Sequence, residues 1–220
     1  MVVKEILNTD IAPLKISDTV GLALTKLDLL HITRFAVVEE GKLVGMVGLE
    51  TLIEVDDETV LIDEIPLDDS ISIPETQHLF EAARKMLDHE LYVVPVTDAD
   101  MNFLGVIRKR EVLEALGDVF NLKSYGSVLT IEMMPYDFTL SELIRIIEIE
   151  GAKILGVAVQ QPGDKTDFFR VSIKLNLEDS SAVSASLERF GYVVTSQVSS
   201  ATIEQNFSER ADELIRYLDI

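Results

Sequence analysis

The sequence repeats one pattern of elements at a separation of about 60 residues. An apolar stretch at residues 34–38 recurs at 92–96. A second apolar stretch, centred on Gly45, recurs around Gly105, 60 positions later. Because the recurrence keeps both its order and its spacing, it indicates two structural units built on one plan. We call residues 14–53 the first copy and residues 71–113 the second copy.

Each copy predicts the element order β-α-β-β-α. A short strand is followed by apolar residues at helical spacing, then by two apolar strands and a second helix. The helical stripe consists of Val20, Leu24, Leu27 and Leu30 in the first copy and of Leu79, Ala82, Ala83 and Met86 in the second. The predicted fold class is therefore α+β, with a tandem pair over residues 1–122 whose repeats span about 1–58 and 59–118.

These motifs resemble the CBS domain, the module named after cystathionine β-synthase. The resemblance covers about residues 1–118 and lies in the strand that contains Ala36 or Pro95 before valine, and in the glycine strand that enters a helix. In this family two copies pack sheet to sheet and form two clefts. These clefts often bind adenosine-containing ligands, so the resemblance implies AMP, ADP, ATP or S-adenosylmethionine as a regulatory ligand.

The resemblance also implies which residues line the clefts. In the family, the helix after the glycine strand carries a Ser or Thr hydroxyl for a phosphate and, three residues later, an Asp for the ribose. The second copy has Arg108 and Glu111 at these positions and keeps a carboxylate, one methylene longer. The first copy has lost it, so we expect a degenerate first cleft formed by Ile16, Thr33, Ala36, Gly48 and Thr51.

A run of three cations at residues 108–110 is the only such run in this acidic chain. It falls at a predicted helix N-terminus, where cations are mildly unfavourable, which favours a role in contacting nucleotide phosphates. The alternative is a solvated cluster that pairs with nearby acids such as Asp98 and Asp100. The residues predicted to bind a nucleotide in the second cleft are Ile73, Tyr92, Pro95, Arg108, Lys109, Arg110 and Glu111.

Past residue 126 the pattern changes, and residues 127–197 predict the order β-α-β-β-α-β of a ferredoxin-like sandwich. Thr139 with Glu142 predicts a capping box at its first helix, and the second helix is expected to carry Val183, Leu187 and Phe190 on one stripe. This region resembles an ACT domain. ACT domains commonly pair sheets across a dimer and bind small ligands, often amino acids.

The loop from Met134 to Leu140 lacks the glycine that amino-acid-binding ACT domains often have there, which hinders the approach of a ligand to the backbone. We therefore expect this domain chiefly to dimerise or to transmit a signal. A final amphipathic helix is predicted within residues 200–220. The whole arrangement is similar to the family of acetoin-utilisation regulatory proteins, a similarity of architecture that does not extend to acetoin metabolism.

The composition argues against several function classes. With 39 acidic and 19 basic residues the formal net charge is −20, which disfavours binding to nucleic acid or to an anionic membrane surface. The chain has no cysteine, so disulfides, thiolate nucleophiles and cysteine zinc sites are excluded. We expect no metal site and no membrane span, and a cytoplasmic location.

The sequence predicts a non-enzymatic regulatory protein that senses an adenosine nucleotide, forms a homodimer and acts on an unknown effector protein. The three histidines do not suggest a catalytic site, because His31 and His89 fall at the ends of corresponding helices. An alternative is a structural adaptor whose clefts bind no nucleotide. A small enzyme of a type that carries no familiar motif is a third possibility.

Overall fold

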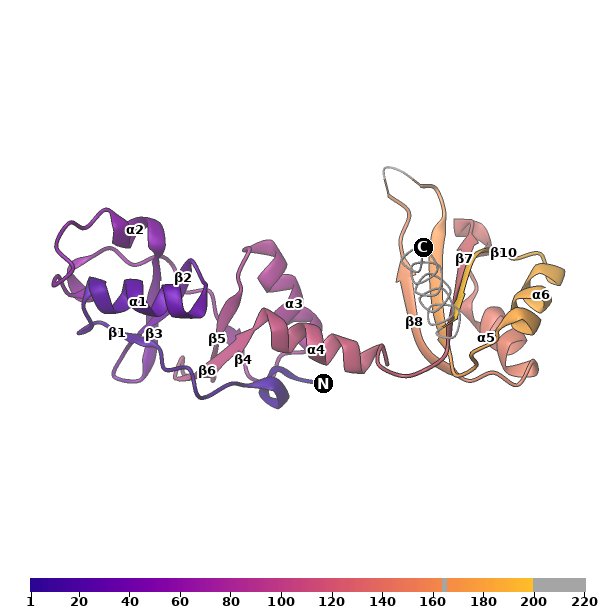
Figure 1. Cartoon of the computed structure of the whole chain (residues 1–220), viewed down its shortest axis with the longest axis horizontal. Helices are drawn as coiled ribbons and strands as arrows, with labels where there is room; N and C mark the ends of the chain where they lie inside the picture. Colours follow the sequence, from indigo (N-terminus) through magenta and orange to yellow (C-terminus); the bar gives the residue numbers. More distant parts are fainter. Residues whose placement is uncertain (164–165, 200–220) are drawn as a thin grey trace, which may run out of the picture. The chain divides into compact units, whose positions relative to one another are not determined.

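The computed structural model describes residues 1–163 and 166–199, and the chain divides into two compact units, residues 1–116 and 117–220 (Figure 1). The predicted C-terminal helix at 200–220 lies outside the described residues. The elements of the first unit are η1 (Val3–Ile6), β1 (Leu14–Lys15), α1 (Val20–Leu30), β2 (Arg34–Glu39), β3 (Lys42–Gly48), α2 (Leu49–Ile53), η2 (Ile62–Glu64), β4 (Ile73–Pro74), α3 (Leu79–Asp88), β5 (Val93–Thr97), β6 (Phe103–Arg108) and α4 (Lys109–Val119), the last of which continues into the second unit.

The two copies form matching three-stranded sheets, in the orders β1-β2-β3 and β4-β5-β6. In each sheet the short first strand pairs parallel with the second, and the second pairs antiparallel with the third. One polar contact repeats as well. Lys26 Nζ donates to the carbonyl of Pro13 at 3.0 Å, and Lys85 Nζ donates to that of Ser72 at 2.6 Å. The β-α-β-β-α order predicted from the repeat is therefore the observed one.

The cores of the two copies are shared. Met46 of the first copy is packed in the core of the second, while Val93 and Val106 of the second copy are packed in the core of the first. All three side chains are at most 5% exposed. Because each copy buries apolar side chains of the other, the two copies fold as one unit.

The glycine common to both copies makes room for the chain segment that precedes the other copy. A Cβ on Gly105 would lie 2.5 Å from the carbonyl oxygen of Asn8, and Gly105 has φ +153. In the first copy, a Cβ on Gly45 would lie 3.0 Å from the carbonyl oxygen of Asp68. Real Cβ atoms essentially never make a contact as short as 2.5 Å, and a contact of 3.0 Å is unusually tight. The recurrence of glycine therefore reflects the close passage of residues 8 and 68 over strands β6 and β3.

The second unit is a sheet with two helices. Its elements are β7 (Ser127–Met133), η3 (Pro135–Asp137), α5 (Leu140–Ile149), β8 (Ile154–Gln160), β9 (Phe169–Leu175), α6 (Ser181–Arg189) and β10 (Val193–Ser199). The sheet is antiparallel with the order β10-β7-β9-β8. Alternate residues of β7 and β9 pack with α5 and α6 in one core, and both helices lie beside the same face of the sheet in Figure 1.

Two local predictions for the second unit were wrong. Thr139 is the N-cap residue of α5, but its side chain makes no capping hydrogen bond. Its expected partner Glu142 accepts a hydrogen bond from Tyr192 instead, so the capping box does not form. Phe190 does not extend the apolar stripe of α6, because the helix ends at Arg189 and the Phe190 side chain is 55% exposed.

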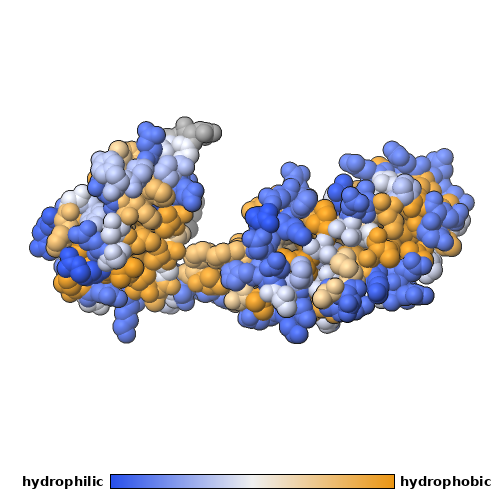
Figure 2. Space-filling view, turned by 180° about the vertical axis from the view of Figure 1, so that it is seen from behind, coloured by the Kyte–Doolittle hydropathy of each residue, from blue (hydrophilic) through white to orange (hydrophobic). Residues whose placement is uncertain are grey.

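Hydrophilic side chains cover much of the surface in Figure 2, with hydrophobic side chains between them in both units. This surface is consistent with the strongly acidic composition. Across residues 1–163 and 166–199, no helix has both the length and the apolar character that crossing a lipid bilayer requires.

Candidate functional site

The basic run lies where β6 passes into α4. Arg108 is the last residue of β6, and Lys109 and Arg110 are the first two residues of α4. The helix N-terminus predicted for the run is therefore confirmed.

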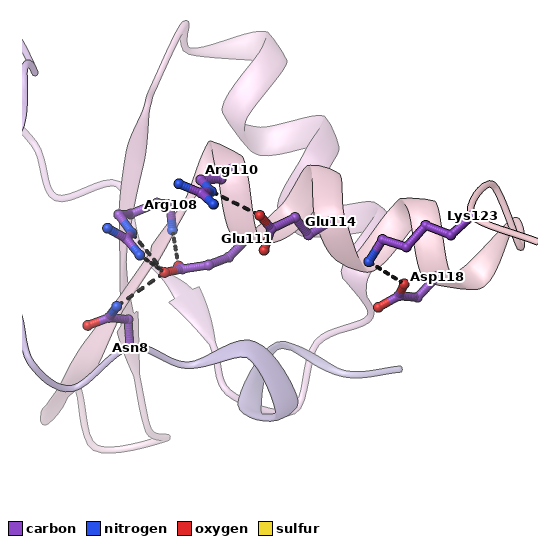
Figure 3. A network of polar contacts seen from close by, with 7 residues as sticks. All are labelled: Asn8, Arg108, Arg110, Glu111, Glu114, Asp118 and Lys123. Carbon is purple, nitrogen blue, oxygen red and sulfur yellow. Dashed lines mark hydrogen bonds and ion pairs between the residues drawn. The ribbon is translucent and has the colours of Figure 1, made fainter.

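The guanidinium groups of Arg108 and Arg110 pair with carboxylates of α4, as Figure 3 shows. Arg108 Nε donates to Glu111 Oε1 at 2.7 Å. One turn further on, Arg110 Nε donates to Glu114 Oε1 at 2.9 Å, in a pair whose side chains are 81% and 53% exposed. Arg108 and Arg110 are thus paired with carboxylates of α4, whereas the Lys109 ammonium lies over the ring of Tyr92.

Asp98 and Asp100, the acids that the sequence suggested as partners for this run, lie instead in a hydrogen-bonded turn. Asp98 accepts a hydrogen bond from Asn102 Nδ2 at 2.7 Å and another from the backbone N–H of Asp100 at 2.9 Å. These contacts close the turn between β5 and β6. The alternative interpretation, that the basic run pairs with acids, describes Arg108 and Arg110, but the partners are Glu111 and Glu114 rather than Asp98 and Asp100. Side chains three or four positions apart are within reach without any tertiary contact.

Glu111 is the centre of the best-connected polar cluster in the first unit. Its Oε2 accepts the backbone N–H of Arg108 at 2.8 Å, and its Oε1 also accepts Asn8 Nδ2 at 3.1 Å. Burial on its own would raise the pKa of Glu111, but the hydrogen bonds from the Arg108 side chain and backbone and from Asn8 outweigh it and hold the pKa below its ordinary value of 4.5. The carboxylate is therefore ionised and already engaged.

The other residues predicted for the second cleft lie on β4 and around β5. The ring of Tyr92 is 56% exposed, and the ammonium of Lys109 sits 5.0 Å from its centroid. Pro95 and Ile73 are buried, Ile73 within the core of the second copy. Arg108, Lys109, Glu111 and Tyr92 therefore lie together, whereas Pro95 and Ile73 serve packing in this conformation.

The first cleft, expected to be degenerate, contains a cavity of about 380 Å³. Its lining includes three of the residues predicted there, Thr33, Gly48 and Thr51. Its other lining residues are Arg34, Leu49, Glu50, Asp68, His89, Glu90 and Leu91. Ala36 is fully buried in β2, and Ile16 is half-buried beside the core of the first copy. Because residues 89–91 belong to the second copy, both copies build this cavity.

Charges of both signs meet in the first cleft. Arg34 Nε lies 3.5 Å from Asp68 Oδ2, and both side chains are 44% exposed. Asp68 is held by two backbone hydrogen bonds with Met46, of 3.0 and 2.8 Å. The cleft lacks the carboxylate at Thr51, but Asp68 brings another from the connection between the copies.

Sequence reasoning missed both Asn8 and Asp68. They occupy equivalent places, because Asn8 pairs with Val106 of β6 as Asp68 pairs with Met46 of β3. A signal was available, since the two residues are 60 positions apart, the spacing of the two glycines. They were overlooked because they lie in irregular connections, outside every strand and helix pattern.

The three histidines lie at helix ends. His31 and His89 follow α1 and α3 as C-caps, and His31 adopts φ +52. His78 precedes α3, where its Nδ1 accepts the backbone N–H of Phe80 at 3.2 Å. Across the described parts of the chain, no three metal-ligating side chains gather into a cluster that could hold an ion.

The family model of the CBS domain matches residues 3–58 and 62–118. The chain belongs to the CBS domain family. The two matched stretches contain the two copies described above, so the first unit is a CBS pair. The cavity that contains Thr51 in its lining and the polar cluster around Glu111 both lie within this pair.

Among curated proteins, the chain is similar to the magnesium transporter MgtE of Enterococcus faecalis, with 31% identity over 84 residues. The match covers 38% of this chain and only 18% of the transporter. Among solved structures, a CBS domain pair/ACT domain protein from Thermotoga maritima is 25% identical, with a TM-score of 0.48, and the match covers 54% of this chain and 98% of that one. The protein CBSX2 in complex with AMP is 23% identical, with a TM-score of 0.46, over 54% of this chain and 97% of that one.

Proposed function

We propose that the CBS pair is a non-enzymatic regulatory module that binds an adenosine-containing nucleotide of the AMP, ADP or ATP type, or S-adenosylmethionine. Membership of the CBS domain family supports the class of function. The observation that carries the proposal is the cavity of about 380 Å³ built by both copies, because small-molecule sites have volumes of about 300–1,000 Å³. A ligand that touches both copies can favour one arrangement of the pair.

In the second cleft, the proposed ligand competes with contacts inside the protein. A phosphate group would draw the Arg108 guanidinium away from Glu111, because guanidinium binds phosphate in a bidentate manner. The carboxylate would then be free to accept ribose hydroxyls. Since the same carboxylate accepts Asn8 Nδ2, binding would also break this side-chain contact with the segment that passes over Gly105, which its backbone bonds to Val106 still hold. This exchange of partners is a route from the nucleotide to the N-terminal segment.

The first cleft, which contains the cavity of about 380 Å³, is the other candidate position. Arg34 is within reach of a phosphate, and the Thr33 and Thr51 hydroxyls line the same cavity. Asp68 already lies beside Arg34, so a nucleotide here would also exchange an internal ion pair for a contact of its own.

Isothermal titration calorimetry with AMP, ADP, ATP and S-adenosylmethionine tests the proposal. We expect binding of at least one of them, weakened about tenfold or more by Arg108→Gln if the second cleft is used and by Arg34→Gln if the first is used, because a hydrogen bond to a charged group contributes about 1.5–3 kcal/mol. Arg84→Gln on α3 is the matched control, since its guanidinium pairs only with Glu81 and Asp88 among the described residues. No heat with any of the four ligands would refute nucleotide binding.

A structural adaptor is the second candidate function. The full engagement of Glu111 favours it, because a carboxylate that already accepts four hydrogen bonds is stable without a ligand. If this candidate is right, none of the four ligands binds and the nucleotide is recovered unchanged after incubation.

We further propose that the second unit is an ACT-like domain through which the chain forms a homodimer and passes the signal to an effector protein. Support comes from its β-α-β-β-α-β order and its β10-β7-β9-β8 sheet, in which β8 is an edge strand, the kind of strand that can pair with another chain. Light scattering on the full chain should give twice the 24.5 kDa of the monomer. A monomeric mass at all concentrations would contradict dimerisation.

A further inference from the structure

The second unit contains a cavity of about 550 Å³ that the nucleotide proposal does not involve. It lies where β7 ends and β10 begins, with the loop before α5 along one side. Its lining residues come from segments far apart in the sequence: Glu132, Met133, Met134, Tyr136, Asp137, Thr139, Glu142, Phe168, Phe190, Gly191, Tyr192 and Val193.

Aromatic rings form much of the wall of this cavity. Tyr136, Phe168 and Phe190 are 79%, 41% and 55% exposed, and Tyr192 is half-buried beside them. Large apolar side chains that gather at one exposed place mark interaction sites, whereas scattered ones do not. The faces of such rings carry negative potential and attract cations. Arg145 shows this attraction, because its guanidinium lies 6.0 Å from the centroid of the Phe190 ring.

The charged groups in the lining are all acidic. They are the carboxylates of Glu132, Asp137 and Glu142, and no Lys or Arg lines the cavity. Glu132 is paired with Arg170 at 2.9 Å, and Glu142 Oε2 accepts the hydroxyl of Tyr192 at 3.0 Å. Within the part of the chain that the structure describes, Asp137 has no ion-pair partner. The lining itself therefore favours a positive charge, although two cations contact it from outside, Arg170 at Glu132 and Arg145 over the Phe190 ring.

The combination of rings and carboxylates selects among cations. A bare metal ion needs several oxygen or nitrogen ligands at close range, and no group of three metal-ligating side chains gathers among the described residues. A cation with apolar carbon around it would instead bury that carbon against the rings while its charge stays near the carboxylates.

We propose that this cavity binds a small organic cation, an ammonium group with apolar substituents, held by the rings of Tyr136, Phe168 and Phe190 and by the carboxylates of Asp137 and Glu142. This ligand class differs from the nucleotide of the CBS pair, and its site lies within the second unit alone. The protein would then bind one small ligand in each unit.

Calorimetric titration of the full chain with choline tests the proposal, and 3,3-dimethylbutan-1-ol serves as the neutral probe of the same shape. We expect choline to bind about tenfold more tightly than the neutral alcohol, within the range that cation–π and carboxylate contacts provide. The same samples titrated with AMP keep the two proposals apart, because either ligand can fail while the other binds.

Variants at exposed positions locate the site without threatening the fold. Tyr136→Ala and Asp137→Asn should each weaken choline binding about threefold or more, as the loss of one ring or one charge implies. The matched controls are Tyr125→Ala, whose ring is 73% exposed outside the cavity, and Glu178→Gln, both of which should leave the affinity unchanged.

Nuclear magnetic resonance of the same titration gives a second readout, with shifts expected at the lining residues. Equal affinity for choline and the neutral alcohol, absence of shifts with choline, or an equal loss in the control variants would each overturn the proposal.

Discussion

The carboxylate of Glu111 joins three parts of the first unit, and its removal should cost far more stability than removal of a similar acid one turn away. Glu111 accepts the backbone N–H of Arg108, the Arg108 guanidinium and the side chain of Asn8. Glu114, on the same helix, pairs only with Arg110 among the described residues. Glu111→Ala and Glu114→Ala are therefore a matched pair of substitutions with the same chemistry in different surroundings.

The contacts of each glutamate determine how much unfolding free energy its substitution should cost. Losing a helix-capping acceptor costs about 1 kcal/mol, and an unpaired polar group such as the Asn8 amide costs a further ~1–3 kcal/mol when it is partly buried. With a small contribution from the ion pair, whose side chains are 43% and 17% exposed, Glu111→Ala should lose about 2–4 kcal/mol. Glu114→Ala breaks an exposed i,i+4 pair and should lose about 0.3–0.5 kcal/mol.

Differential scanning calorimetry of the full chain measures the difference. A domain of this size changes its Tm by about 4 °C per kcal/mol, so Glu111→Ala should lower the Tm of its transition by roughly 10 °C and Glu114→Ala by about 2 °C or less. Asn8→Ala should show coupling to Glu111→Ala in a double-mutant cycle, because the two side chains share a hydrogen bond. Equal losses for the two glutamate variants, or additive effects of Asn8 and Glu111, would refute this account of the cluster.

Three further outcomes are expected. The pKa of Glu111 is lowered in the folded state, so the stability that this carboxylate contributes is present above pH 4.5, its ordinary pKa, and is lost as the pH falls through the folded pKa. The free energy of unfolding of Glu111→Gln should therefore depend less on pH in the acid range than that of the unsubstituted protein. An unchanged pH dependence would contradict this. Gly105→Ala places a Cβ 2.5 Å from the Asn8 carbonyl oxygen and should lose about 1–3 kcal/mol in urea unfolding, whereas Gly117→Ala, with its nearest atom at 3.9 Å, should lose nothing. Burial, followed by the hydrogen bond to Glu142, raises the pKa of Tyr192 to about 12, so tyrosinate absorbance should show one late-ionising group that Glu142→Gln shifts to lower pH and Tyr192→Phe removes.

Local patterns explain why much of the fold was predictable. The strands around Gly45 and Gly105 and the helices after them follow from apolar periodicity and from a spacing that the chain keeps twice. The same reasoning placed the basic run at the start of α4. It failed at Thr139, because a capping box needs a glutamate that is free to turn back, and Tyr192 holds Glu142 from another element, 50 positions away.

The candidate site was less predictable than the fold. Asp68 and Asn8 reach the two clefts from irregular connections, where no periodicity marks a side chain. The expectation of a degenerate first cleft followed from position 51 alone. The structure adds Arg34, Asp68 and residues of the second copy to that cleft, so its chemistry depends on groups that the motif does not contain.

The amino-acid sequence by itself determined the repeat, the element order of both units, the family and the place of the cationic run, because each depends on residues close together in the chain. Only the tertiary structure decided which partners those residues have. In the folded chain Asn8 contacts Glu111, which is 103 positions away in the sequence. The cavity of the first unit lies in the first cleft, and a second cavity beside α5 is lined by aromatic rings and carboxylates. The reason is physical: periodicity dictates which face of an element is buried, but a side-chain contact depends on how the elements pack, and packing is a property of the whole unit.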